Sequence, residues 1–228
     1  TGNDAPMMLE LAAVVALARQ CAPTVAAETL VSLVYTESHF DPYAIGVNAK
    51  GVAAPKVSDR ASAIASARSL IARGYNIDLG LGQINSANLK PLNLSIEDAF
   101  EPCRNLAASA RVLAENYTSV AKSSRSTEDA IATAMSMYNT GNRWKGFANG
   151  YVGKVYASSS SIIPQIRQRA GIAMADAPIA KAAQSPAPTP SPVADPPDQS
   201  WNTSAVAQTA TLMVFGSSQT APLKGQPE

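Results

Sequence analysis

Residues 34–42 read VYTESHFDP, with Glu37 near their centre. Residues 25–38 are expected to form a helix, because four of their side chains recur at helical spacing: Leu30, Leu33, Val34 and Glu37. Glu37 then lies at the helix end, between core side chains and a cleft. Burial there raises the pKa of a carboxyl and keeps it protonated as a general acid. The alternative is an ordinary helix-end glutamate that faces solvent.

A second stretch, residues 78–85, reads DLGLGQIN. Its glycines, Gly80 and Gly82, allow the backbone to pass close to another segment or to a ligand. Gln83 and Asn85 flank Ile84, so alternation along a strand places both amides on one face while Ile84 points into the core. Amides donate and accept hydrogen bonds, which suits the hydroxyl and acetamido groups of a sugar. The alternative is a turn followed by a strand with no binding role.

A third stretch, residues 137–141, reads MYNTG and ends a helix, with Asn139 and Gly141 as candidate capping residues. Tyr138 and Asn139 are then expected at a rim, where a phenol and an amide are available for binding. Taken alone, this pattern indicates no more than a helix stop.

Helix signals dominate the rest of the folded part. Apolar residues recur at helical spacing in residues 58–73, which stop at Gly74, and in residues 102–120. Ser126 with Asp129 resembles a capping box and predicts a helix over residues 127–138. Another helix is expected at residues 9–18, an apolar stretch without the flanking features of an export signal.

One region has few helix signals. Residues 41–51 and 75–85 are rich in Gly, Asn and alternating apolar residues, which favours short strands or irregular loops. The expected fold class is therefore mainly α, with a small β or loop element beside the helix that carries Glu37.

Composition and charge exclude several classes of function. The 228 residues are 46% apolar, enough for a sizeable core. Eighteen Lys and Arg against 17 Asp and Glu give a net charge of +1, which excludes broad electrostatic capture of nucleic acid or of a membrane surface as the main role. No apolar run reaches the roughly 18 residues of a membrane span. One His and two Cys predict no metal site and no cofactor, so catalysis rests on carboxylates, hydroxyls and amides.

The composition divides the chain into three parts. Residues 7–173 are the expected folded domain, and residues 174–200 the expected linker, rich in Pro, Ala and Ser. Residues 201–228 are expected to be a disordered tail. Their apolar patch at 211–215, TLMVF, is alternatively a segment that docks on a partner.

Together, Glu-Ser-x-Phe, Gly-Leu-x-Gln-Ile-Asn and Tyr-Asn-x-Gly, in this order and at this separation, resemble the soluble lytic transglycosylase family. The resemblance covers about residues 8–160 and implies a goose-type lysozyme-like, α+β fold. It is strongest to the small members that serve type IV secretion systems, the VirB-type peptidoglycan-cleaving subunits. Three further segments carry that likeness: QCAP at 20–23, EPC at 101–103 and GFANGYV at 146–152.

The resemblance assigns a role to each candidate residue. The catalytic acid falls on Glu37 and the neighbouring hydroxyl on Ser38. The glycan-contacting glutamine falls on Gln83, and the pair that lines the cleft falls on Tyr138 and Asn139. Two features depart from the family pattern. Gly82 stands where many relatives have Met, and residues 52–76 resemble a helical insertion that walls one end of the groove.

The implied reaction needs one carboxyl, because the N-acetyl group of N-acetylmuramic acid replaces the second carboxylate of ordinary glycosidases. Glu37 donates a proton to the leaving oxygen and then takes one from the C6 hydroxyl, which closes a 1,6-anhydro ring. Tyr138, Asn139 and Ser38 steady the acetamido group or Glu37.

Two alternatives stay open. One is a muramidase that hydrolyses the same bond with water, using Asp41 or Asp78 as base, although both aspartates have ready roles in turns. The other is a non-catalytic wall-binding subunit of an assembly. His39 is expected at a solvent-facing helix end rather than in a proton shuttle.

The resemblance also implies a location and partners: the periplasm of a Gram-negative bacterium, with peptidoglycan strands and type IV secretion subunits. A disulfide between Cys21 and Cys103 fits an exported protein and would join the helix ahead of Glu37 to the helix that starts near Pro102. Two unpaired buried thiols are the alternative.

Overall fold

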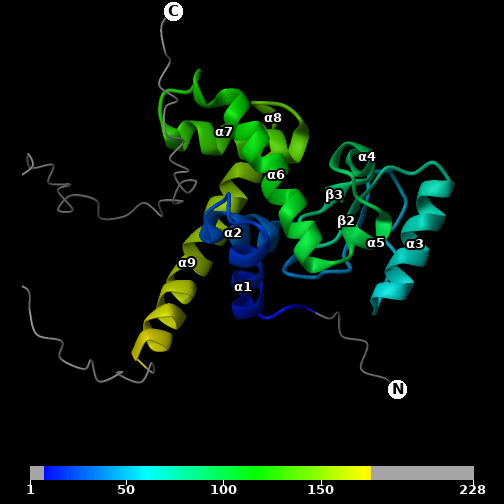
Figure 1. Ribbon diagram of the computed structural model, residues 1–228. Coiled ribbons are helices and arrows are strands. Elements are labelled where there is room, and N and C mark those ends of the chain that lie inside the picture. Colours follow the sequence, from blue (N-terminus) through cyan, green and yellow to red (C-terminus); the bar gives the residue numbers. More distant parts are fainter. Residues whose placement is uncertain (1–7, 176–228) are drawn as a thin grey trace, which may run out of the picture.

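Helix α2, Ala27–Ser38, lies at the centre of a helical lobe. The computed structural model describes residues 8–175, and their side chains as far as residue 168. Within α2 the side chains of Leu30, Val31, Leu33 and Val34 are completely buried. Helices α1, α6 and α9 pack around it, as Figure 1 shows. The apolar side chains of α2 therefore fix the position of its last turn, which carries Glu37.

The described part contains eleven further elements besides a short 3-10 turn at Ser86–Asn88: α1 (Leu11–Cys21), β1 (Ile45–Val47), α3 (Arg60–Ala72), β2 (Ile77–Leu79), β3 (Ile84–Asn85), α4 (Leu89–Leu92), α5 (Ile96–Ala99), α6 (Pro102–Ala121), α7 (Thr127–Thr140), α8 (Lys145–Ala148) and α9 (Tyr151–Ala175). The predicted class, mainly α with a small β element, is confirmed.

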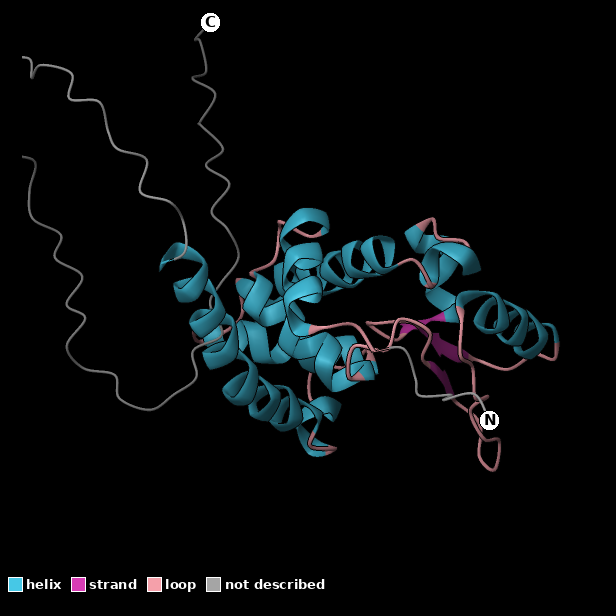
Figure 2. Ribbon diagram, turned by 90° about the horizontal axis from the view of Figure 1, so that it is seen from below, coloured by secondary structure: helices cyan, strands magenta, loops and turns pink. Residues whose placement is uncertain are grey.

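The three strands form an antiparallel sheet in the order β1-β2-β3. Asp78 of β2 pairs with Gly46 of β1 and with Asn85 of β3. Figure 2 shows the strands grouped to one side of the main helices. A second apolar cluster, which includes Ile77 and Phe100, joins the sheet to α3, α4 and α5. This sheet lobe is the small β element expected beside the Glu37 helix.

Helix α6 connects the two lobes. It contacts β3 and α5 in the sheet lobe and α1 and α7 in the helical lobe (Figure 1). Its first turn is capped by Glu101, whose side chain accepts hydrogen bonds from the backbone N–H groups of Cys103 and Arg104. A disulfide between Cys21 and Cys103 ties this end of α6 to the end of α1, with the Cα atoms 5.4 Å apart. The expected pairing of the two cysteines is therefore present.

The chain turns sharply after α2. His39 and Phe40 have φ angles of 54° and 69°, in the left-handed region that non-glycine residues adopt at some energetic cost. The Phe40 carbonyl accepts a hydrogen bond from the Leu9 N–H at 3.0 Å, and the Phe40 side chain is buried. This turn ends α2 directly after Ser38 and leaves His39 exposed, as expected.

The predicted helices occur, with two differences at their ends. Ser126 caps α7 by accepting the Asp129 N–H at 3.1 Å, but the Asp129 carboxylate accepts the Arg125 N–H instead of returning a bond to Ser126. The capping box is therefore only half formed. A complete one, which the sequence pattern did not suggest, starts α3 between Asp59 and Ser62.

Two expectations concern the limits of the domain. The segment 52–76 supplies α3, which contacts β2 and α5, and none of its residues lines the cleft described below. Helix α9 continues to Ala175, two residues beyond the expected boundary at 173. Residues 176–228, which comprise all but the first two residues of the expected linker and the whole expected tail, lie outside the described residues. Between residues 8 and 175 no helix has the length and apolar character that crossing a membrane requires.

Candidate active site

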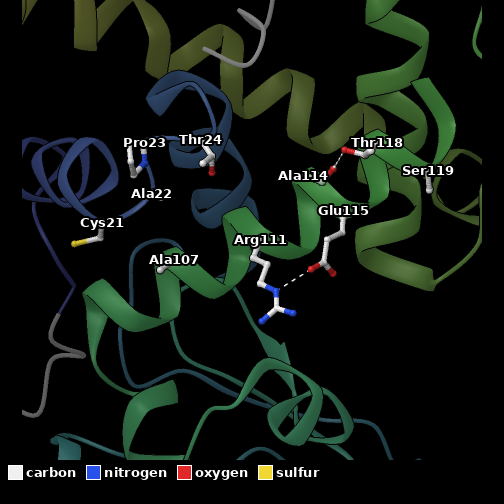
Figure 3. Close-up of a pocket in the computed structure, with 10 residues that line it drawn as sticks. All are labelled: Cys21, Ala22, Pro23, Thr24, Ala107, Arg111, Ala114, Glu115, Thr118 and Ser119. Carbon is white, nitrogen blue, oxygen red and sulfur yellow. Dashed lines mark hydrogen bonds and ion pairs between the residues drawn. The ribbon is translucent and has the colours of Figure 1, made fainter. Parts of the chain in front are cut away.

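Two cavities of about 620 and 600 Å³ border α6. The larger lies between α6 and the α1–α2 turn, beside Cys21 and Pro23 (Figure 3). Its ionisable lining residues, Arg111 and Glu115, point toward one another and form an exposed ion pair at 2.8 Å. This cavity holds none of the candidate catalytic or sugar-binding residues, so it is not the candidate active site.

The second cavity, which we call the cleft, contains most of the candidate residues. It lies between the two lobes and is lined by side chains of α2, the sheet, α4, α6 and α7. The candidates that line it are Glu37, Asp78, Gln83, Asn85, Tyr138 and Asn139. Residues separated by up to 102 positions are therefore gathered around one carboxyl, and the cleft is the candidate active site.

Glu37 is partly buried in the last turn of α2. Burial raises the pKa of its carboxyl from the ordinary 4.5 to about 7. The negative charge of Asp78 adds to this rise, whereas a hydrogen bond from the Tyr151 hydroxyl to Glu37 Oε1 opposes it. A substantial fraction of the carboxyl is therefore protonated at neutral pH, as a general acid requires.

Tyr151 is a site residue that the sequence analysis missed. It begins α9, where the Asn149 side chain accepts its backbone N–H at 3.0 Å, and its own side chain is only 7% exposed. Burial and the charge of Glu37 both raise the pKa of the Tyr151 phenol, so it stays a hydrogen-bond donor. Its segment, residues 146–152, contributes to the family resemblance, but nothing in the local sequence pattern indicates a contact with Glu37.

Asp78 faces the cleft from the middle of β2. Its Oδ1 accepts a hydrogen bond from Asn85 Nδ2 at 2.7 Å, and its Oδ2 accepts one from Asn48 Nδ2 at 2.8 Å. Asp41, the other aspartate considered as a base, accepts the Tyr43 N–H at 2.8 Å and does not line the cleft. The structure therefore brings one of the two aspartates into the cavity of Glu37.

Gln83 lines the cleft through a turn rather than through strand alternation. Its φ is 49°, and β3 contains only Ile84 and Asn85. Gln83 Nε2 donates to the carbonyls of Gly80 at 2.9 Å and Ala44 at 3.2 Å. Ile84 points into the core as expected. The side-chain amide of Gln83 is therefore fixed before any ligand arrives.

Gly82 lies in the β2–β3 hairpin, residues 77–85, where close packing against α6 and α7 leaves no room for a side chain. A Cβ at this position would overlap Ser109 Oγ and would lie 2.9 Å from the Tyr138 hydroxyl. The Tyr138 hydroxyl donates to the Gly82 carbonyl at 2.7 Å. This chain therefore has glycine where many relatives have Met, and at that position Tyr138 contacts the hairpin backbone directly.

Of the two remaining candidates, Asn139 lies at the edge of the cleft and Ser38 lies outside it. Asn139 is exposed at the rim, and its Oδ1 accepts a hydrogen bond from Asn149 Nδ2 at 2.9 Å. Ser38 does not line the cleft, because its hydroxyl donates to the Leu81 carbonyl at 2.8 Å. This bond ties the last turn of α2 to the glycine-rich hairpin, so Ser38 orients the acid's helix relative to the sheet lobe. In the part of the chain that the structure describes, no group of acidic, His or Cys residues is suited to hold a metal ion.

The fold and the cleft agree with a comparison to known families. Residues 15–159 match the model of the Transglycosylase SLT domain, which is more than half of the chain. The chain therefore belongs to the SLT transglycosylase family, and the resemblance predicted from the motifs is confirmed.

The similar proteins with curated names carry the name virB1. The type IV secretion system protein virB1 of Brucella suis biovar 1 (strain 1330) is 38% identical over 165 residues, which cover 67% of this chain and 68% of the relative. Protein virB1 of Rhizobium radiobacter is 38% identical over 150 residues, covering 66% and 62%. That of Agrobacterium fabrum (strain C58 / ATCC 33970) is 35% identical over 152 residues, covering 67% and 61%. No solved structure matches the chain significantly.

Proposed function

We propose that this chain is a peptidoglycan lytic transglycosylase that cleaves the β-1,4 bond between N-acetylmuramic acid and N-acetylglucosamine and closes a 1,6-anhydro ring. The observation that carries the proposal is the buried carboxyl of Glu37, which lines the cleft and has a pKa raised to about 7. Family membership supports the general class of activity. The ring-closing chemistry is the part that the proposal adds.

In the first step the protonated Glu37 donates its proton to the glycosidic oxygen, and the bond from that oxygen to C1 of the muramic acid breaks. The N-acetyl carbonyl oxygen of the same sugar bonds to C1 and compensates the positive charge that develops there. Glu37 is now a carboxylate, and the Tyr151 hydroxyl stabilises that anion through the hydrogen bond to Oε1.

In the second step Glu37 accepts the proton of the C6 hydroxyl while O6 attacks C1 and displaces the N-acetyl oxygen. The carboxyl is protonated again and no water is consumed. Gln83, Asn85, Tyr138 and Asn139 line the cleft and supply the amide and phenol groups that bind the sugars. Ser38 acts by holding the hairpin against α2.

A hydrolytic muramidase is the second candidate function, and the position of Asp78 favours it. This carboxylate lines the same cleft as Glu37, and both of its oxygens accept amide hydrogen bonds that fix its orientation. An aspartate in that place can activate a water molecule. The two reactions differ by one water in the product.

The names of the relatives support a place in the cell envelope. We propose that the chain opens the wall locally for a type IV secretion or conjugation apparatus, in the periplasm of a Gram-negative bacterium. The disulfide is consistent with that oxidising compartment. We further propose that residues 7–173 form the catalytic domain and that residues 174–200 link it to a tail, 201–228, that contacts secretion subunits. A chain that ends at Ala175, where α9 ends, should keep its cleavage activity and lose that association.

The test is digestion of purified sacculi followed by mass spectrometry of the products. Products with 1,6-anhydro-muramic ends support the lytic transglycosylase, and reducing ends support the muramidase. Glu37→Gln should abolish cleavage and preserve the fold. Glu115→Gln is the matched control, since Glu115 also lines the cleft but is exposed and paired with Arg111. Intact cleavage by Glu37→Gln, or none by the unaltered chain, would refute the enzymatic assignment.

A further inference from the structure

Two aromatic side chains stand exposed just beyond the cleft. Trp144 precedes α8 and is 70% exposed, and Phe147 lies within α8 and is 42% exposed. Together with Met8 they are the large apolar residues most exposed among residues 8–168. Exposed apolar groups that occur together, with polar residues around them, mark interaction sites or ligand-binding grooves, and Trp144 and Phe147 are only three positions apart.

The segment that presents Trp144 is rigid. Asn142 Oδ1 accepts the backbone N–H groups of Trp144 at 2.9 Å and Lys145 at 3.2 Å. Ser136, buried in α7, donates to the Asn142 carbonyl at 2.8 Å and accepts the Gly146 N–H at 2.9 Å. Gly146 lies so close to Ser136 that a Cβ would clash with the backbone of α7. The backbone that carries the indole is therefore held by hydrogen bonds, which lowers the cost of ordering this segment when a ligand binds.

This segment is continuous with the cleft at both ends. Thr140 and Gly141 line the cleft, and the chain runs from them directly into residues 142–149. The Thr140 hydroxyl donates to the Asn142 carbonyl at 3.1 Å. After α8, Asn149 bonds to Asn139 on the cleft rim. Figure 1 shows α8 packed at the end of α7, which carries these rim residues. A polymer that leaves the cleft past α7 therefore passes over residues 142–149.

The charges beside Trp144 suit peptidoglycan. Arg143 and Lys145 are exposed on either side of it, and neither takes part in an ion pair within the described part of the chain. Sugar rings present a face of C–H groups that stacks on aromatic rings, while the stem peptides of peptidoglycan carry carboxylates. A stacking ring between two cations matches both features of such a strand.

We propose that residues 142–149 form a distal glycan subsite, in which Trp144 stacks on a sugar of the strand outside the cleft and Arg143 and Lys145 face its peptide carboxylates. This inference rests on the proposed function, because the occupant is the polymer whose bond lies at Glu37. The subsite favours long strands over fragments that fill the cleft alone.

The first test measures KM and kcat on long peptidoglycan strands and on a tetrasaccharide fragment. Trp144→Ala should raise the ratio of the two KM values, long strand to tetrasaccharide, roughly tenfold, the loss expected for one stacked ring. Trp144→Phe should restore most of it. Met8→Ala, which removes an exposed apolar side chain outside the cleft, should leave the ratio unchanged.

The second test does not depend on the folding of an alanine variant. The sequence has two tryptophans, so Trp201→Phe combined with Glu37→Gln leaves Trp144 as the sole indole in an inactive chain. Its fluorescence should shift with long strands and stay constant with the tetrasaccharide. A constant signal with long strands, or an unchanged KM ratio in Trp144→Ala, would overturn the subsite. Either result is also the one expected if a protein partner, and not the glycan, covers this surface. Failure of the unaltered chain to cleave strands would overturn the proposed function as well.

Discussion

The Tyr151 hydroxyl donates a hydrogen bond to Glu37 Oε1 and so joins the first residue of α9 to the last turn of α2. The bond opposes the rise in the Glu37 pKa that burial causes. Burial keeps the carboxyl protonated for the first proton transfer, and Tyr151 stabilises the carboxylate that remains afterwards. The two effects together place the carboxyl where it can both give and take a proton near neutral pH.

Tyr151→Phe removes this bond and keeps the ring. Because the bond favours the charged form of Glu37, its loss should raise the pKa of the carboxyl further and move the alkaline limb of the kcat/KM profile to higher pH. A hydrogen bond to a charged group contributes about 1.5–3 kcal/mol, so its loss should lower the rate at the optimum by roughly 10- to 150-fold. The pH dependence of cleavage checks this prediction, and a shift of the limb to lower pH would contradict it.

Asp78→Asn removes the charge that adds to the raised pKa of Glu37. The alkaline limb should therefore move to lower pH, opposite to the effect of Tyr151→Phe. Under the ring-closing mechanism the variant still releases anhydro products, whereas the muramidase would lose its base. Asp41→Asn is the control, because Asp41 caps a turn outside the cleft. Complete loss of cleavage in Asp78→Asn alone would favour hydrolysis.

Gly82→Ala places a methyl group against Ser109 Oγ and close to the Tyr138 hydroxyl. Overpacking of this kind costs about 1–3 kcal/mol of unfolding free energy, measured by urea denaturation. Ser109→Ala in the same chain should recover part of the loss. The control is Gly153→Ala in α9, where a Cβ meets nothing within 4 Å and the change should stabilise by about 0.5–1 kcal/mol. Equal stability of Gly82→Ala and the unaltered chain would show that the hairpin shifts freely.

Cys21 and Cys103 close a loop of 82 residues, for which the loop-entropy model gives about 4–5 kcal/mol of stabilisation. Replacing both by Ala should lower the unfolding free energy by an amount of that order and leave cleavage measurable, since the bridge is remote from the cleft lining. Reductant should lower the unfolding free energy of the unaltered chain but not that of the variant with both cysteines replaced by Ala. If reductant lowers the stability of both proteins equally, the bridge does not account for the difference.

Local sequence patterns predicted most of the helix ends and turns that position the site residues. The turn at Gly80–Gly82 and the end of α7 at Gly141 each follow from capping or turn preferences that act within a few residues, whereas the end of α2 places His39 and Phe40 in the left-handed region. The short strands followed from the same kind of signal. Such preferences hold in almost any tertiary context, which is why they can be recognised in one sequence.

The contacts between distant segments were not predictable in this way. Tyr151 lies 114 residues from Glu37, and only the packing of α9 on α2 brings them together. Ser38 was expected to face the substrate, yet the approach of the hairpin turns its hydroxyl to Leu81. The exposed indole of Trp144 likewise depends on a network with Ser136 that no periodicity indicates.

The central claim is that the Glu37 carboxyl has a pKa near neutral and is therefore substantially protonated in the cleft at neutral pH. A titration of its side-chain carboxyl by carbon-13 NMR, with the signal assigned by its absence in Glu37→Gln, measures this directly. The account predicts a midpoint of about 7. A midpoint at the ordinary value of 4.5 would contradict it, since the acid would then be ionised before any glycan arrived.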